Sequence, residues 1–236
     1  MIGKRRHSRR GIHVYISATV VVALFFSGCQ TAGIFRDTAS VSRPEWEDLS
    51  TRELDRIQLK LVEGAKYVQE SQRLIINGRR FNNDCTGTVL AIYWYAGIDL
   101  MEPLVKYQGN GVNRLYLFLK DSQALVETRN PVAGDIIFWD NTYDRNGDRE
   151  ANDYLTHTGM VVAVEEDGTI HYVHHNYRKG IVFARMNLYR PDVYTEEVDG
   201  KPIIINSPMR MRGSPGYDKW LASELTRSFG RAWAVF

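Results

Sequence analysis

Residues 83–97 place a cysteine at the start of an apolar helix. Either Asn83 or Asp84 can cap the N-terminus of this helix, and Gly97 suits its end. Cys85 then lies in the first turn, where the helix dipole and unpaired N–H groups lower the pKa of a thiol. The apolar residues spaced to form one buried face are Val89, Ile92, Tyr93 and Ala96. The stretch therefore predicts a helix that carries either a reactive thiolate or a small core residue.

Residues 1–28 have the three parts of a signal peptide: a basic start, an apolar run, and the small residues Ser27 and Gly28 directly before Cys29. A small pair before cysteine resembles the lipobox of bacterial lipoproteins, which predicts a lipid on Cys29 and export to the cell envelope. Gln30 at the next position favours the periplasmic side of the outer membrane if the cell is Gram-negative. The alternative is an uncleaved membrane anchor, for which the run is short. Residues 29–48 show no periodicity and are interpreted as a tether, and residues 49–236 as one domain.

Removal of the signal peptide changes the net charge of the chain, and lipidation of Cys29 changes the number of its free cysteines. Five of the 30 basic residues and none of the 28 acidic residues lie in residues 1–28, so the remaining chain has 25 bases, 28 acids and a net charge of −3. This balance gives no basis for a nucleic-acid partner. The two cysteines are Cys29 and Cys85, so lipidation would leave Cys85 as a single thiol in an oxidising compartment. Exported proteins usually pair such thiols, which favours a chemical role for Cys85.

The order of elements predicts an α+β domain with helices packed on a mostly antiparallel sheet, because helical patterns come first and strand patterns follow. A capping box at residues 50–53 predicts a helix that ends near Ser71. Residues 115–119 predict a second short helix, and the spacing of Leu221, Leu225 and Phe229 predicts a C-terminal one. The predicted strands are residues 136–139, 158–164, 169–175, 181–186 and 203–205.

The histidines outside the signal gather around one predicted hairpin; they are His157, His171, His174 and His175. A two-residue turn would pair Gly159 with His174 and place His157 and His174 on one face of the sheet. A three-residue loop would select His171 and His175 instead, and the spacing leaves both open. A thiolate requires a base and a third group that orients the base. His157 is the candidate base and His174 the orienting group, with Gly159 leaving room for a substrate backbone.

Four segments resemble one family. Residues 84–87, Asp-Cys-Thr-Gly, are similar to the Asp-Cys-Ser-Gly motif of NlpC-type cell-wall peptidases, which are papain-like hydrolases. Residues 131–139 resemble that family's Pro-x-x-Gly-Asp strand, residues 156–162 its histidine strand, and residues 167–174 the strand of its third catalytic residue. The related CHAP amidases are similar as well. The resemblance covers roughly residues 80–190 and favours His174 over His171.

The resemblance implies a papain-like NlpC/CHAP fold with its nucleophile at a helix N-terminus, acting on peptidoglycan stem peptides without a cofactor. Cys85 would attack an amide carbonyl, His157 would take and return the proton, and His174 would orient His157. The backbone N–H of Cys85 would help to form the oxyanion hole.

Further residues follow from the same resemblance. Asp84 and Thr86 match positions that line the substrate groove, and Asn176 matches a further polar residue of CHAP amidases. Thr86 replaces the commoner serine. Tyr67 is the candidate for the family's upstream tyrosine.

Three other possibilities are open: a calcium site, a zinc site, and an enzymatic reaction on another substrate. Asp144, Asn146 and Asp148 are spaced like the first ligands of a calcium loop, although Arg149 stands where an EF-hand needs glycine. A structural calcium ion and a plain acidic turn are both open. An envelope lipoprotein that binds zinc through Cys85, His157 and His174 is a non-enzymatic alternative. A papain-like amidase or acyltransferase on another substrate is the enzymatic one.

Overall fold

The structure is a computed structural model that describes residues 55–211 and 218–236. All described residues belong to one compact unit. The predicted signal peptide, Cys29, the tether and the capping box at residues 50–53 therefore lie outside the described residues. Within the described part, no helix combines the length and apolar character needed to cross a membrane.

The four α-helices precede all strands of the large sheet, as predicted, and one 3-10 turn follows the last strand. They are α1 (Arg56–Ser71), α2 (Cys85–Tyr95), α3 (Met101–Leu104), α4 (Gly111–Asp121) and a final 3-10 turn, η2 (Ala232–Ala234). Asp55 caps α1 by accepting hydrogen bonds from the backbone N–H groups of Ile57 and Gln58 at 2.9 and 3.1 Å. The Gln58 side chain accepts in return from the Asp55 N–H, so a capping box starts this helix one turn later than the predicted one.

The strands form one large sheet and two small hairpins. The large sheet contains β3 (Leu125–Val126), β10 (Thr226–Gly230), β4 (Ile136–Trp139), β5 (His157–Val164), β6 (Thr169–Asn176) and β7 (Gly180–Asn187), in that spatial order. Every neighbouring pair in it is antiparallel. The small hairpins are β1 (Ile75–Ile76) with β2 (Arg79–Arg80), and β8 (Thr195–Val198) with β9 (Lys201–Ile204). The predicted α+β class with an antiparallel sheet is confirmed.

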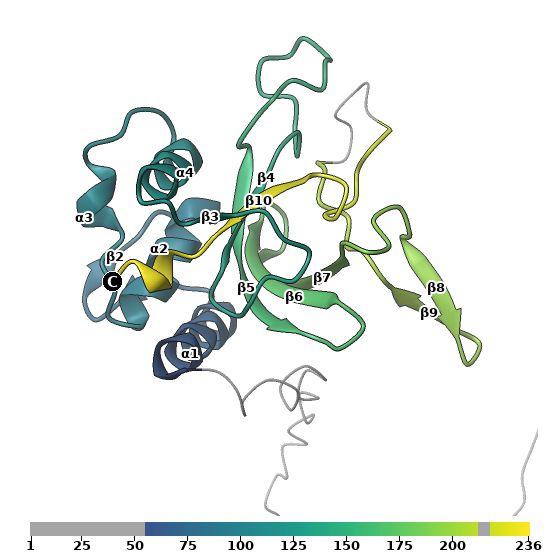
Figure 1. The fold of residues 1–236 in the computed structure, drawn as a ribbon, viewed down its shortest axis with the longest axis horizontal. Coiled ribbons are helices and arrows are strands. Elements are labelled where there is room, and N and C mark those ends of the chain that lie inside the picture. The colour runs from purple at the N-terminus through teal and green to yellow at the C-terminus, as the bar shows by residue number, and fades with distance from the viewer. Residues whose placement is uncertain (1–54, 212–217) are drawn as a thin grey trace, which may run out of the picture. The chain divides into compact units, whose positions relative to one another are not determined.

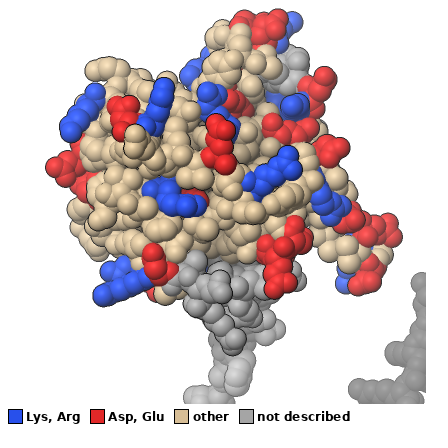
Figure 2. Space-filling view, viewed as in Figure 1, with Lys and Arg blue, Asp and Glu red and all other residues tan. Residues whose placement is uncertain are grey.

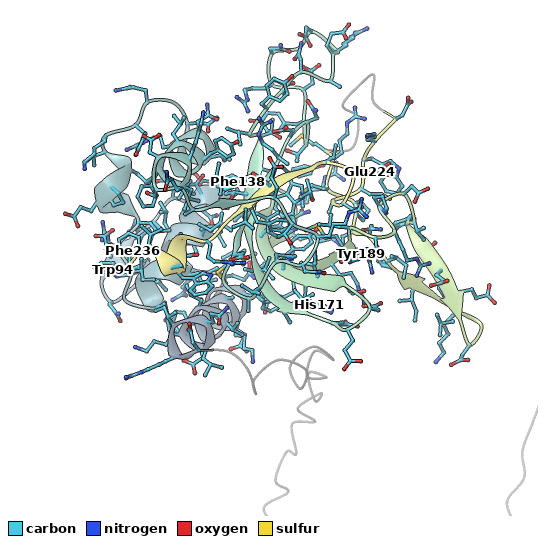
Figure 3. All side chains as sticks on the ribbon, in the orientation of Figure 1. Trp94, Phe138, His171, Tyr189, Glu224 and Phe236 are labelled. Atoms are coloured by element: carbon cyan, nitrogen blue, oxygen red, sulfur yellow. The ribbon has the colours of Figure 1, made fainter. Side chains whose placement is uncertain are left out.

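Both faces of the large sheet are buried (Figure 1). The helices cover one face, where Phe138 and Met160 of the sheet join Leu61, Ile92 and Leu115 of the helices in one core. The segment that leads into β10 covers the opposite face and forms a second core; its members include Ile137, Trp139, Tyr172, Leu225 and Phe229. Figure 3 shows Phe138 between the two sides, with Trp94 and Phe236 on the helical side.

The predicted C-terminal helix is wrong. Leu221, Leu225 and Phe229 are all buried, the last two in the second core, but the chain there makes a turn and then enters the sheet as β10. A hydrogen bond from the Leu225 N–H to the Leu221 carbonyl closes a single helical turn at 3.2 Å. β10 then pairs with β3 and β4, because its backbone groups complete the ladders of both strands. The spacing of four residues therefore predicted correctly that these side chains are buried, but it predicted the wrong secondary structure.

The β5–β6 hairpin reaches the predicted pairing by another route. Its loop has three residues, because the Glu165 N–H donates to the Thr169 carbonyl at 2.8 Å and Val164 pairs with Ile170. A register shift between Val161 and Ala163 then moves the pairing by one residue. The predicted two-residue turn is therefore wrong. The predicted pair of Gly159 with His174 is nevertheless present, because the shift compensates for the longer loop.

Candidate active site

The N-terminus of α2 holds Cys85 against the sheet. Asp84 caps the helix by accepting a hydrogen bond from the Gly87 N–H at 2.7 Å. Gly87 is needed for close packing, since a Cβ there would lie 1.9 Å from the Asn82 carbonyl oxygen. Gly97, with a φ of +91°, follows the end of the helix as predicted. These contacts fix the first turn of α2, in which Cys85 is a half-buried free thiol.

Two adjacent strands bring His157 and His174 together. His157 begins β5, and His174 lies near the end of β6. His157 Nε2 and His174 Nδ1 are 2.9 Å apart, a hydrogen-bond distance. If His157 Nε2 carries the proton of this bond, its Nδ1 is left as an acceptor. The predicted base and its predicted orienting group are thus in contact.

The ring of Trp139 packs against both His157 and His174, a contact that sequence reasoning missed. Its ring centroid lies 5.7 Å from that of His157 and 6.4 Å from that of His174, and the side chain is fully buried. A hydrogen bond from Trp139 Nε1 to the Ala222 carbonyl, 2.9 Å long, fixes the ring. No local pattern in the sequence indicated this contact, because it depends on the register in which β4 pairs Trp139 with His157.

Gly159 serves packing rather than substrate access. A Cβ at this position would lie 2.6 Å from the Val173 carbonyl oxygen, 3.1 Å from Trp139 and 3.2 Å from His174. The space next to Gly159 is therefore filled by the indole and the imidazole. The expectation that it leaves room for a substrate backbone is wrong.

One cleft of about 800 Å³ contains the three predicted catalytic residues. Its lining comes from the α2 N-terminus, from β5 and β6, from residues 142–143, from the β6–β7 turn, and from residues 208–211, which lie beyond the segment that the family resemblance covers. The lining residues used below are Asp84, Cys85, His157, His174, His175, Asn176, Arg178, Lys179 and Arg210. His175, which the predicted hairpin placed on the opposite face, also reaches this cleft.

The thiol of Cys85 is neutral in the resting site. Burial raises its pKa above the ordinary value, and the negative charge of Asp84 raises it further. Hydrogen bonds from the backbone N–H of Thr158 and from Thr86 act in the opposite direction and are outweighed. The expected lowering of the Cys85 pKa is therefore contradicted. The contact with Thr158 also places the sulfur next to the residue that follows His157.

The histidines of the cleft are neutral as well. Burial lowers the pKa of His157 to about 4, and the nearby His175 contributes to that shift. Burial lowers the pKa of His174 well below its ordinary value, with His157 and His175 adding to the effect. Burial also lowers the pKa of His175, although the charge of Asp84 opposes this shift. These directions favour a neutral thiol and an unprotonated imidazole over an ion pair at neutral pH.

The structure shows where the residues that were predicted to line the substrate groove lie. Thr86 is buried at the base of the first turn, and Asp84 caps α2 while it faces the cleft. Asn176 Oδ1 accepts hydrogen bonds from the N–H groups of Arg178 and Lys179, so its side chain shapes a turn. Tyr67 is half exposed and packs on Tyr95 at 5.5 Å between ring centroids; it does not line the cleft.

A second cavity, of about 270 Å³, is lined by Thr86 and, like the first cleft, by Asp84. Arg80 lines this cavity together with the apolar side chains of Phe81, Leu90 and Leu104. Arg79, its neighbour in sequence, instead pairs with Asp99 at 2.7 Å and lies over the Trp94 ring. Of the two arginines that precede the cysteine, Arg80 is the one that faces a cavity.

The loop with the calcium-like spacing is held by its own hydrogen bonds. Asp144 accepts from the N–H groups of Gly147 and Arg149, at 2.7 and 3.0 Å. Asp148 accepts from the Glu150 N–H at 2.8 Å, and the Asn146 amide donates to Asp148 at 2.7 Å. These bonds connect the residues of the loop to one another, and calcium binding by Asp144, Asn146 and Asp148 stays a prediction.

In the part of the chain that the structure describes, no group of three or more His, Cys, Asp or Glu side chains is placed to hold a metal ion. The zinc alternative for Cys85, His157 and His174 gains no support from this geometry. On the face drawn in Figure 2, acidic and basic side chains are interspersed, without a large area of one sign.

The fold and the cleft are compatible with the papain-like class of hydrolases, in which helices pack on an antiparallel sheet. Residues 76–176 match the family model of the CHAP domain, so the chain contains a CHAP domain over this range. The resemblance to the CHAP and NlpC-type superfamily is thereby confirmed. A CHAP domain suggests a function of the peptidoglycan hydrolase or amidase type. Comparisons with curated proteins and with solved structures found no match.

Proposed function

We propose that this protein is a thiol hydrolase that cleaves amide bonds in peptidoglycan stem peptides. The observation that carries the proposal is the shared cleft, which is lined by Cys85 at a helix N-terminus and by His157 in hydrogen-bond contact with His174. A nucleophile, a base and a group that orients the base are the parts that acyl transfer requires. The CHAP match supports peptidoglycan as the substrate.

The neutral site sets the order of the proton transfers. His157 removes the proton from the Cys85 thiol as the sulfur attacks the amide carbonyl carbon, and the carbonyl oxygen becomes an oxyanion. The unpaired N–H groups at the start of α2 face this charge. His157 then gives its proton to the leaving amine, and a thioester remains on Cys85. Water, deprotonated by His157, attacks the thioester carbonyl and releases the acid and the thiol.

His174 acts as a positioning residue in this scheme. A His157 Nε2–H that donates to His174 Nδ1 holds the tautomer in which His157 Nδ1 can accept the thiol proton. His174 is buried and also contacts the rings of Trp139 and Tyr172, so its own orientation is constrained.

The proposal includes a place in the cell. The signal-like residues 1–28 and Cys29 support a lipid-anchored protein at the bacterial envelope, on the periplasmic side of the outer membrane if the cell is Gram-negative. A domain tethered at the membrane would meet the peptidoglycan layer that it cleaves.

Digestion of purified sacculi tests the reaction. The wild-type chain should release muropeptide fragments with a new amine terminus, which mass spectrometry identifies. Cys85→Ala and His157→Ala should each lose at least about a thousandfold in kcat/KM, because the step then lacks its nucleophile or its base. Both variants should melt within a few degrees of the wild type.

A thiol-directed electrophile tests the nucleophile independently. Alkylation of Cys85 in a sample treated with chelator should abolish cleavage, with peptide mapping to locate the adduct. Full activity of Cys85→Ala, or activity that is lost with the chelator and restored by zinc, would disprove the thiol mechanism.

A further inference from the structure

We infer that the turn between β6 and β7, residues 176–180, is a binding site for substrate carboxylates; this rests on the proposed function. The turn directly follows the strand that carries His174, so its side chains lie beside the reacting groups. Asn176, Tyr177, Arg178 and Lys179 all line the cleft that contains Cys85. This turn begins at the last residue of the CHAP match and continues beyond it.

The turn is ordered by hydrogen bonds from its backbone to the Asn176 side chain. Asn176 Oδ1 accepts from the Arg178 N–H at 2.9 Å and from the Lys179 N–H at 3.1 Å. The Arg178 guanidinium carbon lies 5.1 Å from the centroid of the Tyr177 ring, which limits the positions of that long side chain. A cation that is held in place before binding loses less conformational entropy when a ligand arrives.

The turn is also fastened to α1. Gln72, at the C-terminus of this helix, donates from Nε2 to the Ile181 carbonyl at 2.7 Å and accepts from the Ile181 N–H at 2.9 Å. Gly180 has a φ of +71°, and a Cβ there would lie 2.4 Å from the Gln72 side-chain oxygen. The basic turn is therefore held from both sides, by Asn176 and by Gln72.

The charges of the cleft favour an anionic ligand. Among the described residues that line it, Arg178, Lys179 and Arg210 are basic, and Asp84 is the one acid. Within the described residues, neither Arg178 nor Lys179 forms an ion pair with an acidic side chain. The two exposed cations of the turn are thus available to a carboxylate, which a guanidinium binds through paired hydrogen bonds.

The two cations of the turn favour a stem peptide whose side-chain carboxylates are free. Amidation of those carboxylates removes the charge and replaces hydrogen-bond acceptors with donors. The protein should therefore prefer the free acid to the amidated peptide, and the preference should fall with rising salt concentration.

The test compares two muropeptides, one with free side carboxylates and one with the same groups amidated. The variant is Arg178→Ala with Lys179→Ala in the full chain. The matched control is Arg129→Ala, because Arg129 is also exposed and lies 5.7 Å from a tyrosine ring, that of Tyr189, but does not line the cleft.

For the double variant, KM for the free-acid muropeptide should rise about tenfold, because one exposed ion pair contributes up to about fivefold. Its kcat should stay within about twofold, and its KM for the amidated muropeptide should be unchanged. Arg129→Ala should behave like the wild type with both substrates. Equal KM values of the wild type for the two muropeptides, or the same loss in the control, would overturn the inference.

Binding separates this inference from the proposed function. Dissociation constants of the full chain with Cys85→Ala are measured for both muropeptides, with and without the two turn substitutions. A preference for the free acid that the turn substitutions remove supports the carboxylate site even where the wild type cleaves no muropeptide. The absence of that preference overturns the site even where cleavage is normal.

Discussion

His157, the base of the proposed mechanism, has a low basicity that comes from its surroundings. Burial beside Trp139 and His174 lowers the pKa of the imidazole to about 4, far from the usual value near 6.5. A base with this pKa is unprotonated throughout the neutral range, and it draws the thiol proton only as the new bond forms.

The low pKa predicts an acid-tolerant enzyme. The acidic limb of kcat/KM should fall near pH 4, because His157 is lost as a base only when it is protonated. Hydrolysis of a soluble muropeptide between pH 3.5 and 8 gives the profile. A limb near pH 6.5 would mean that His157 is solvated in the working enzyme.

The same shift makes stability depend on pH. The unfolded chain binds a proton at His157 near pH 6.5, whereas the folded chain binds it only near pH 4. Stability should therefore fall as the pH drops from about 6.5 to 4, by at most about 1.4 kcal/mol per pH unit for this group. Urea unfolding at pH 7 and pH 5 measures the loss. His157→Gln should reduce the slope.

His174→Gln tests the orienting contact. An amide can still accept a hydrogen bond from His157 Nε2, so the variant should keep more activity than His174→Ala. We expect a loss in kcat of about tenfold for the glutamine and about a hundredfold for the alanine, with KM nearly unchanged. Equal losses in the two variants would mean that His174 acts only by packing against Trp139 and does not orient His157.

At the scale of elements, the α2 N-terminus depends on a glycine. A Cβ on residue 87 would overlap the Asn82 carbonyl oxygen, so Gly87→Ala must displace the segment before the helix or the helix itself. We expect a loss of about 2 kcal/mol in unfolding free energy and at least tenfold in kcat. Gly97→Asn, which tolerates the left-handed conformation and meets no atom within 4 Å, is the control and should be nearly neutral.

The β5–β6 hairpin shows how one strand irregularity decides which histidine is used. Its three-residue loop would pair the strands in the register that selects His171 and His175. The shift between Val161 and Ala163 restores the register in which Gly159 faces His174. His171 instead bonds to Glu165 at the loop end of β6.

For the whole molecule, an ion pair between a buried carboxylate and a partly exposed arginine joins the C-terminal segment to the sheet. Asp135 is fully buried and accepts hydrogen bonds from Arg231 at 3.1 and 3.0 Å and from Trp233 Nε1 at 3.1 Å. The pair connects the start of β4 to the end of β10. In the sheet, both strands lie on the same side of β5, the strand that carries His157.

Breaking that pair should destabilise the domain. Arg231→Ala leaves the Asp135 carboxylate buried without its cation and should reduce the free energy of unfolding by about 3 kcal/mol. Arg227→Ala removes a more exposed pair with Asp140 and should cost less than about 1 kcal/mol. Thermal and urea unfolding of both variants provide the comparison.

The proposed anchor is tested at the same scale. Cys29→Ser should move the protein from the membrane fraction to the soluble fraction and prevent incorporation of labelled fatty acid. Cys85→Ser is the control and should remain in the membrane fraction. Labelling that persists in Cys29→Ser would exclude lipid attachment at this residue.

The sequence by itself determined the elements whose signals are local. A cap at Asn83 or Asp84, the apolar run of α2, the strands around His157 and His174, and the order of helices before strands could all be predicted, because neighbours along the chain carry these signals. The motif around Cys85 indicated the CHAP relationship for the same reason.

Only the tertiary structure decided the rest. Burial raised the pKa of Cys85 where the helix dipole predicted a lower one, since desolvation depends on what packs around the thiol. Trp139, the strand β10 and the basic turn beyond Asn176 became parts of the site or its support through contacts between distant segments. Spacing along one chain records neither the register of two strands nor the solvent that packing excludes, and these two quantities set the chemistry of the cleft.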